Sequence, residues 1–222
     1  MRNEPGDGSD RRALNELFEP LYETVPEGMK AEVVDGVVST WPQRSMYWEI
    51  TMSVLCQLDI RCGQRSRLMS DVRLDLPRRL NAFCPDLFKL SDGAEPDEEG
   101  HWRYQDVEFV LEVISRETGL HDYGPKKAAY AEGKVPVHLI VDPYTAKWHL
   151  HTLPENGAYR SQQSMDFGAP VDLTSTALGL TLETGEFPRD CRRRSGPRCA
   201  PRDAGTHRLT RSPTPATART PR

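Results

Sequence analysis

Residues 107–114 read Val-Glu-Phe-Val-Leu-Glu-Val-Ile, an apolar run interrupted only by Glu108 and Glu112. A strand this apolar is typically central in its sheet and covered on both faces. A carboxylate buried there without a partner would cost roughly several kcal/mol. We therefore expect Glu112 to be paired, hydrogen-bonded or bound to a metal, and a buried arginine is one partner that would serve.

A second acid stands close to this strand in the expected sheet. Residues 82–90 predict a neighbouring strand, within which Asp86 follows Pro85. Carboxylates on adjacent strands can converge, and two of them suit a hard divalent cation such as Mg²⁺. Taken alone, an Asp after a Pro is commonly a turn or cap residue, so the prediction depends on Glu112 lying beside it.

The rest of the first 187 residues alternates between strand and helix patterns. Apolar spacing predicts helices over residues 10–21, 44–61 and 123–133, a strand over 67–76 ended by Pro77, and strands over 135–141 and 148–153. Asp35-Gly36 between two β-branched runs predicts a hairpin. These elements make an α+β or α/β domain with a mixed sheet and helices packed on it.

Charge divides the chain into an acidic body and a basic tail. Residues 1–187 hold 19 basic and 31 acidic groups, whereas residues 188–222 hold ten Arg and two Asp. We expect a leader and helix over 1–27, the domain over 28–187 and a disordered Arg/Pro-rich tail over 188–222, which cannot bury enough apolar surface to fold. The tail is either a nucleic-acid-binding arm or an extension without a role.

Cysteine usage and hydropathy favour a cytoplasmic protein. The five cysteines form no Cys-x-x-Cys pair and are odd in number, which argues against a disulfide framework and a structural zinc site. No apolar run approaches the ~20 residues that a membrane-spanning helix needs, and the N-terminus lacks the apolar core of a signal peptide.

The helix over 123–133 carries a lysine that could act with the two acids. Lys126 follows one loop after the strand of Glu112, and we expect its helix to pack back against the sheet. An ammonium group close to a bound cation can orient a water or offset charge on a phosphate. The alternative is a solvated Lys126 beside Lys127 on an exposed face.

Four blocks in this order resemble the Uma-type restriction endonuclease family, part of the PD-(D/E)xK nuclease superfamily. They are Pro85-Asp-Leu-Phe88, Phe109–Ser115, Asp122–Tyr130 and Val135–Pro143, preceded by the hairpin Ala31–Val38. The resemblance covers about residues 28–187. It implies a restriction-endonuclease-like mixed β-sheet flanked by helices.

The resemblance also implies a set of site residues. In the superfamily the lysine usually stands two residues after the second acid, but here that residue is Ile114, so the following helix would supply it. Asp122, Lys126 and Tyr130 keep the spacing of the family's Asp-x-x-x-Lys-x-x-x-Tyr block, which places them along one helical face. The implied catalytic residues are Asp86, Glu112 and Lys126; the implied ligands of Mg²⁺ (or Mn²⁺) are Asp86, Glu112 and the carbonyl of Val113; the implied supporting residues are Glu32, Ser115 and Tyr130.

Three positions depart from the family pattern. Tyr47 stands where many relatives carry a histidine, and Ser115 is followed by Arg116-Glu-Thr118 rather than Pro-Ser/Thr. Pro125 directly before Lys126 is tolerated if the helix begins there, because the first turn needs no backbone donor.

Two functions from different classes remain open. The first is a Mg²⁺-dependent endonuclease that hydrolyses phosphodiester bonds in DNA, with dimerisation expected by analogy alone. The second is a catalytically inactive nuclease-fold module for binding or assembly. A nuclease with an acidic body would need a local basic face, for which the sequence offers Arg61, Arg65, Arg67, Arg73, Arg78 and Arg79.

Overall fold

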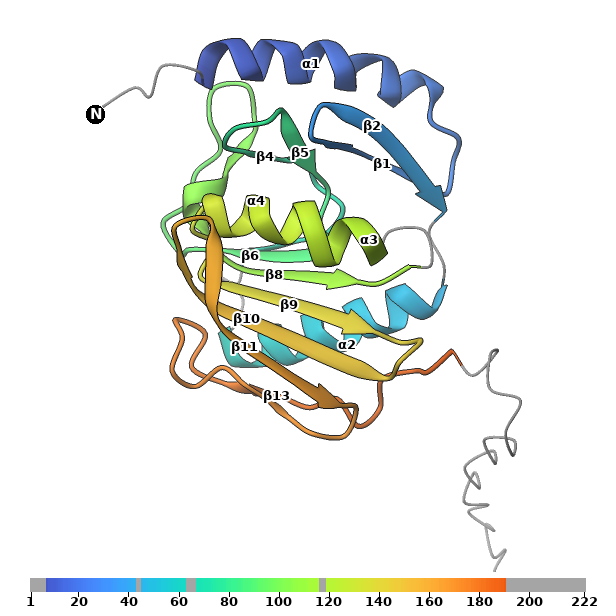
Figure 1. Cartoon of the computed structure of the whole chain (residues 1–222), viewed down its shortest axis with the longest axis vertical. Coiled ribbons are helices and arrows are strands. Elements are labelled where there is room, and N and C mark those ends of the chain that lie inside the picture. The colour runs from blue at the N-terminus through green and yellow to red at the C-terminus, as the bar shows by residue number, and fades with distance from the viewer. Residues whose placement is uncertain (1–6, 43–44, 63–66, 116–118, 191–222) are drawn as a thin grey trace, which may run out of the picture. The chain divides into compact units, whose positions relative to one another are not determined.

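The computed structural model describes residues 7–42, 45–62, 67–115 and 119–190, which belong to one compact unit (Figure 1). The predicted tail from residue 191 onward, the first six residues of the leader, Arg65 and residues 116–118 lie outside the described residues.

A six-stranded mixed sheet forms the centre of the unit. Its strands, in spatial order, are β11 (Ala158–Asp166), β10 (Lys147–Glu155), β9 (Val137–Asp142), β8 (Val107–Val113), β6 (Leu87–Leu90) and β3 (Arg67–Met69). Strand β8 runs parallel to β9 and antiparallel to β6. All of its residues except Glu108 are buried, which confirms the predicted central strand.

A smaller five-stranded sheet holds the hairpin. Its order is β2 (Val37–Pro42), β1 (Met29–Val34), β5 (Asn81–Phe83), β4 (Leu74–Leu76) and β7 (Trp102–Arg103). The hairpin turn at Asp35-Gly36 is confirmed: φ is +49° and +77°, the double positive φ that matches the twist of paired strands. A short pair, β12 (Val171–Asp172) and β13 (Thr181–Leu182), completes the strands that the structure describes.

Two predicted strands are each divided between the sheets. Residues 67–76 form β3 and β4, separated by a turn in which Asp71 has a φ of +56°. Residues 82–90 contribute to β5 and β6, with Pro85 between them. A proline has no N–H to give to a ladder, so the strand stops and the chain passes from one sheet to the other. The predictions of two continuous strands were therefore wrong.

Helices cover both faces of the six-stranded sheet (Figure 1). The helices of the unit are α1 (Asp7–Thr24), α2 (Ser45–Cys62), α3 (Gly119–His121) and α4 (Lys127–Glu132), with a 3-10 turn η2 (Tyr104–Asp106). On one face, α2 buries the predicted apolar stripe Tyr47, Ile50, Val54 and Leu58. On the other, α4 lies between this sheet and the smaller one, and α1 packs on the smaller sheet through Leu14 and Phe18. No helix in the described part of the chain has the length and apolar character to cross a bilayer.

The helix that carries Lys126 does not begin at Pro125. It is already present at Gly119, and Pro125 lies inside a π-helical turn, η3 (Asp122–Lys126), which connects α3 to α4. A proline in a regular helix clashes with the carbonyl four residues earlier. The wider turn, with hydrogen bonds to the fifth residue, relieves that clash.

The hairpin turn gives a stability prediction. Gly36→Ala should lower the free energy of unfolding by about 1 kcal/mol, because an L side chain is strained at its positive φ even though the nearest atom to an added Cβ is 3.8 Å away. Gly93→Ala is the matched control, since an added Cβ there meets nothing within 4 Å and its φ is not in the left-handed region. Urea unfolding measures both; equal effects would contradict the assignment.

Candidate active site

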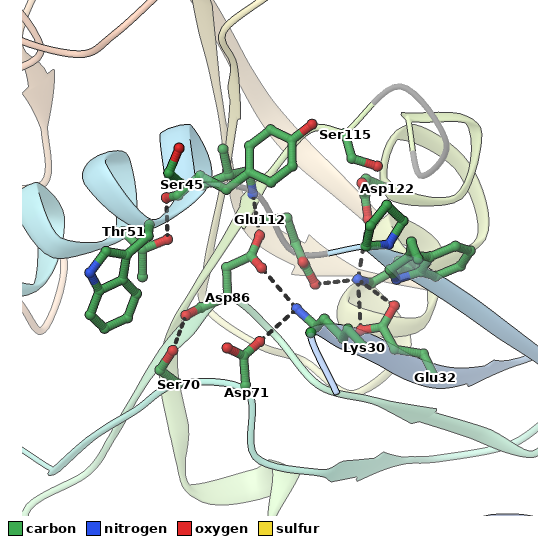
Figure 2. Close-up of a pocket in the computed structure, with 17 residues that line it drawn as sticks. Lys30, Glu32, Ser45, Thr51, Ser70, Asp71, Asp86, Glu112, Ser115 and Asp122 are labelled. Carbon is green, nitrogen blue, oxygen red and sulfur yellow. Dashed lines mark hydrogen bonds and ion pairs between the residues drawn. The ribbon is translucent and has the colours of Figure 1, made fainter. Parts of the chain in front are cut away.

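The crossing between the two sheets places Asp86 opposite Glu112. Leu87 of β6 pairs with Leu111 of β8, so Asp86 and Glu112 occupy the next cross-strand position on the same face of the sheet. Both line a pocket of about 550 Å³ that also includes Glu32 from β1 (Figure 2). The predicted convergence of the two acids is therefore seen.

Glu112 is 2% exposed and has two partners. Its Oε1 lies 2.7 Å from Nζ of Lys126 and accepts a hydrogen bond of 2.6 Å from the Tyr130 hydroxyl. The partner expected for a buried acid in this strand thus exists, and it is a lysine with a tyrosine rather than an arginine.

Lys126 is the most enclosed charge of the site. It is 2% exposed, so the solvated alternative is wrong. Besides Glu112, its Nζ contacts both carboxylate oxygens of Glu32 at 3.1 Å and Oδ1 of Asp122 at 3.2 Å. The spacing of Asp122, Lys126 and Tyr130 therefore directs all three side chains toward the same place, as predicted.

Asp86 is held by groups that the sequence did not indicate. Its Oδ2 accepts the backbone N–H of Val113 at 2.7 Å, and its Oδ1 lies 2.8 Å from Nζ of Lys30. Lys30 also contacts Asp71 at 3.1 Å (Figure 2). A signal for Lys30 was present, because it stands two residues before Glu32 and so shares its strand face.

The supporting residues lie at the edges of this cluster. Glu32 is fully buried and accepts the backbone N–H of Cys84 at 2.8 Å, while Ser115, 6% exposed, lines the pocket. Tyr47, in place of the family's histidine, also lines the pocket and shares a 2.6 Å hydrogen bond with the Tyr144 hydroxyl.

Two of the arginines expected to form a basic face are engaged in ion pairs. Arg67 contacts Glu95 at 3.2 Å, and the buried Arg73 contacts Asp75 at 2.6 Å. Their charges are thus partly neutralised within the chain.

Two neutral histidines of the six-stranded sheet lie beside Tyr130. His138 lies 4.9 Å from the Tyr130 ring, and His151 stacks on His138 at 5.4 Å between ring centroids. Burial lowers the pKa of His138 well below its usual value and that of His151 to about 4. The cluster therefore adds no positive charge to the site at neutral pH.

Acids outnumber bases around the pocket. Its lining includes five carboxyl groups, from Glu32, Asp71, Asp86, Glu112 and Asp122, but only two ammonium groups, from Lys30 and Lys126. Burial, together with the neighbouring carboxylates, raises the pKa of Glu112 to about 8 despite Lys126 beside it. Burial lowers the pKa of each lysine, but the carboxylates outweigh it and hold both pKa values above the usual range.

This donor set fits a hard cation that uses few protein ligands. Among the described residues, no three His, Cys, Asp or Glu side chains are arranged as a ready-made metal site. Mg²⁺ commonly takes one or two carboxylates and completes its shell with waters and phosphate oxygens. Asp86 and Glu112 can supply that pair, and the surplus of carboxyl groups favours added positive charge.

Comparisons with known proteins agree with this geometry. A family model described as "Uma2: Putative restriction endonuclease" matches residues 16–185. The chain is similar to a solved structure described as a putative nuclease belonging to DUF820 from Anabaena variabilis ATCC 29413, with 14% identity and a TM-score of 0.57. The match covers 71% of this chain and 88% of that one, and the likeness confirms the nuclease-type fold. A search of curated proteins gave no match.

The raised pKa of Glu112 gives a prediction with a definite sign. The folded protein binds this proton more tightly than the unfolded chain, so the contribution of the group is present below about pH 4.5 and is lost as the pH rises to about 8. Glu112→Gln keeps an oxygen for Tyr130 and Lys126 but removes the charge. It should stabilise the protein in EDTA, by on the order of 1–3 kcal/mol at pH 9 and less at pH 6.

The matched control is Glu108→Gln on the same strand. Glu108 contacts the buried Nζ of Lys89 at 2.6 Å, so its neutralisation should lower the melting temperature at both pH values. A Glu112→Gln variant that is destabilised equally at pH 6 and pH 9 would show that the charge of the Glu112 carboxylate does not destabilise the folded protein.

Proposed function

The chain belongs to the Uma2 family, described as putative restriction endonucleases, and we propose that it hydrolyses phosphodiester bonds in DNA with the help of Mg²⁺. One observation carries the proposal: Asp86 and Glu112 converge across β6 and β8 beside an enclosed ammonium group, in a pocket that opens at the surface. Mn²⁺, which accepts the same oxygen ligands, could replace Mg²⁺.

In this proposal Asp86 and Glu112 would hold the ion. When bound there, the ion would supply a water of lowered pKa and polarise the phosphate. The Val113 N–H fixes the orientation of the Asp86 carboxylate, and the Tyr130 hydroxyl fixes that of Glu112. The carbonyl of Val113 is the third ligand that we propose.

Lys126 would act as a fixed positive charge. Contacts with Glu32, Glu112 and Asp122 hold its Nζ and keep it protonated. An ammonium group in this state cannot take a proton from water, so its proposed role is to orient the attacking water and offset charge on the phosphate. Glu32 then supports Lys126, and Ser115 contributes a hydroxyl to the pocket wall.

A specific observation favours the non-catalytic alternative. Lys30 and Lys126 contact Asp86 and Glu112 at 2.8 and 2.7 Å, so each proposed metal ligand already has an ammonium partner. A module that keeps these acids for structure would show the same pairs. For a nuclease, Lys30 must leave Asp86 when the ion binds, and Asp71 is in place to retain it.

Three further expectations belong to the proposal. DNA is the proposed partner, and the arginine-rich tail is a candidate contact because clustered Arg neutralises phosphates. Association of two copies follows from analogy with restriction-type folds, and the cytoplasmic location from the sequence.

Cleavage of plasmid DNA with Mg²⁺ or Mn²⁺ tests the site. Asp86→Asn and Lys126→Ala should each reduce the rate by about 100-fold or more, since one removes a ligand and the other the fixed charge. Lys127→Ala is the matched control, because this adjacent lysine does not line the pocket and should be neutral. Circular dichroism verifies that each variant folds; activity retained in Asp86→Asn would remove the assignment.

Titration with Mn²⁺ separates the two functions without requiring cleavage. Lys30→Met keeps the aliphatic stem but frees Asp86, so calorimetry should give about tenfold tighter binding than in the wild type. Asp86→Asn should bind no ion, and Lys127→Met should match the wild type. If neither the wild type nor Lys30→Met binds Mn²⁺, the acids are structural and the non-catalytic alternative holds.

A further inference from the structure

The pocket has a second wall that the proposed chemistry does not use. Six of its lining residues come from β2 and α2 and are aromatic, proline or small polar side chains, namely Trp41, Pro42, Ser45, Tyr47, Trp48 and Thr51. Figure 2 shows Ser45 and Thr51 of α2 on one side of Asp86, with Lys30 and Glu32 on the other. The α2 residues that line the pocket, which include Tyr47 and Trp48, therefore carry no charge.

Trp48 is a pocket-lining side chain of α2 that lies outside the buried core clusters. It lies one turn from both Ser45 and Thr51, and it is 55% exposed. The buried face of α2 is supplied by other residues, and Trp41 is 8% exposed and packs on His121. In contrast, the described residues give the Trp48 indole no ring partner. Pockets that bind organic ligands are commonly lined by aromatic side chains, and Trp48 is available for that role.

The pocket is too large for the ion and phosphate alone. A cation with six waters occupies roughly 200 Å³, since each water takes about 30 Å³. The pocket measures about 550 Å³, within the usual range for sites that bind small organic ligands. Space of nucleotide size therefore remains in the pocket beside the acids.

We propose that Trp48 stacks on the base of an unpaired nucleotide whose phosphate lies beside Asp86, Glu112 and Lys126. The inference rests on the proposed nuclease function and names its substrate class: single-stranded nucleic acid. In a duplex both faces of each base are covered by neighbouring pairs, so only an unpaired base can offer a face to the indole.

The charge of the body supports recognition through a base. Residues 1–187 carry 31 acidic and 19 basic groups, and Arg67 and Arg73 are paired within the chain. Duplex binding usually draws on many contacts between cationic side chains and phosphates, which an acidic body supplies poorly. Stacking on an aromatic side chain contributes to affinity without neutralising phosphates.

Binding of labelled oligonucleotides with Ca²⁺ in place of Mg²⁺, followed by fluorescence anisotropy, tests the inference through binding alone. The full chain should bind a single strand at least tenfold more tightly than the duplex of the same sequence. Trp48→Ala should weaken single-strand binding by about tenfold or more, and Trp48→Phe should retain most of it. Ile60→Ala is the matched control, because Ile60 is an exposed apolar residue of α2, 85% exposed, that does not line the pocket.

The outcomes separate this inference from the function on which it rests. Equal binding by Trp48→Ala and wild type, preference for duplex, or no binding of a single strand would overturn the stacking role. If Trp48→Ala instead changes the elution of the free protein in gel filtration, Trp48 contacts a second copy of the chain and the inference fails. Cleavage that depends on Asp86 but not on Trp48 would leave the nuclease proposal standing. Binding that depends on Trp48 without any cleavage would retain the stacking role and remove the nuclease proposal.

Discussion

The arrangement of the site depends on one buried ammonium group. Nζ of Lys126 contacts Glu112 of the six-stranded sheet, Glu32 of the five-stranded sheet and Asp122 of its own helix. A charge removed from water is strongly unfavourable unless it is paired, so these contacts must form together. They fix the helix and the two sheets relative to one another, and the pocket exists because those three parts meet there.

The same cluster carries more acid than its lysines neutralise. Such an excess is unfavourable for folding, and binding sites commonly retain such features because function requires them. Lys30 limits the cost at Asp86, as Lys126 does at Glu112. The two lysines differ, however, in their carboxylate partners. Lys126 has three, whereas Lys30 has Asp71 in addition to Asp86 and can keep that contact when Asp86 binds a cation.

Local patterns predicted the parts of the fold that local chemistry decides. The hairpin at Asp35-Gly36, the central strand and the spacing that directs Lys126 and Tyr130 toward Glu112 are all present. The errors fall where distant packing decides. Alternation of apolar residues does not report which sheet a strand joins, so the division at Pro85 was missed. The partner of Asp86 was missed for the same reason, since Lys30 is 56 residues away in the chain.

The crossing between the sheets also bears on the order of folding. Glu32 and Lys126 are 94 residues apart, so their contact closes a long loop whose entropy must be offset before the contact stabilises anything. Contacts of this kind form late, after local hairpins and helices. A chain emerging from the ribosome therefore lacks the assembled site until its second half has been made.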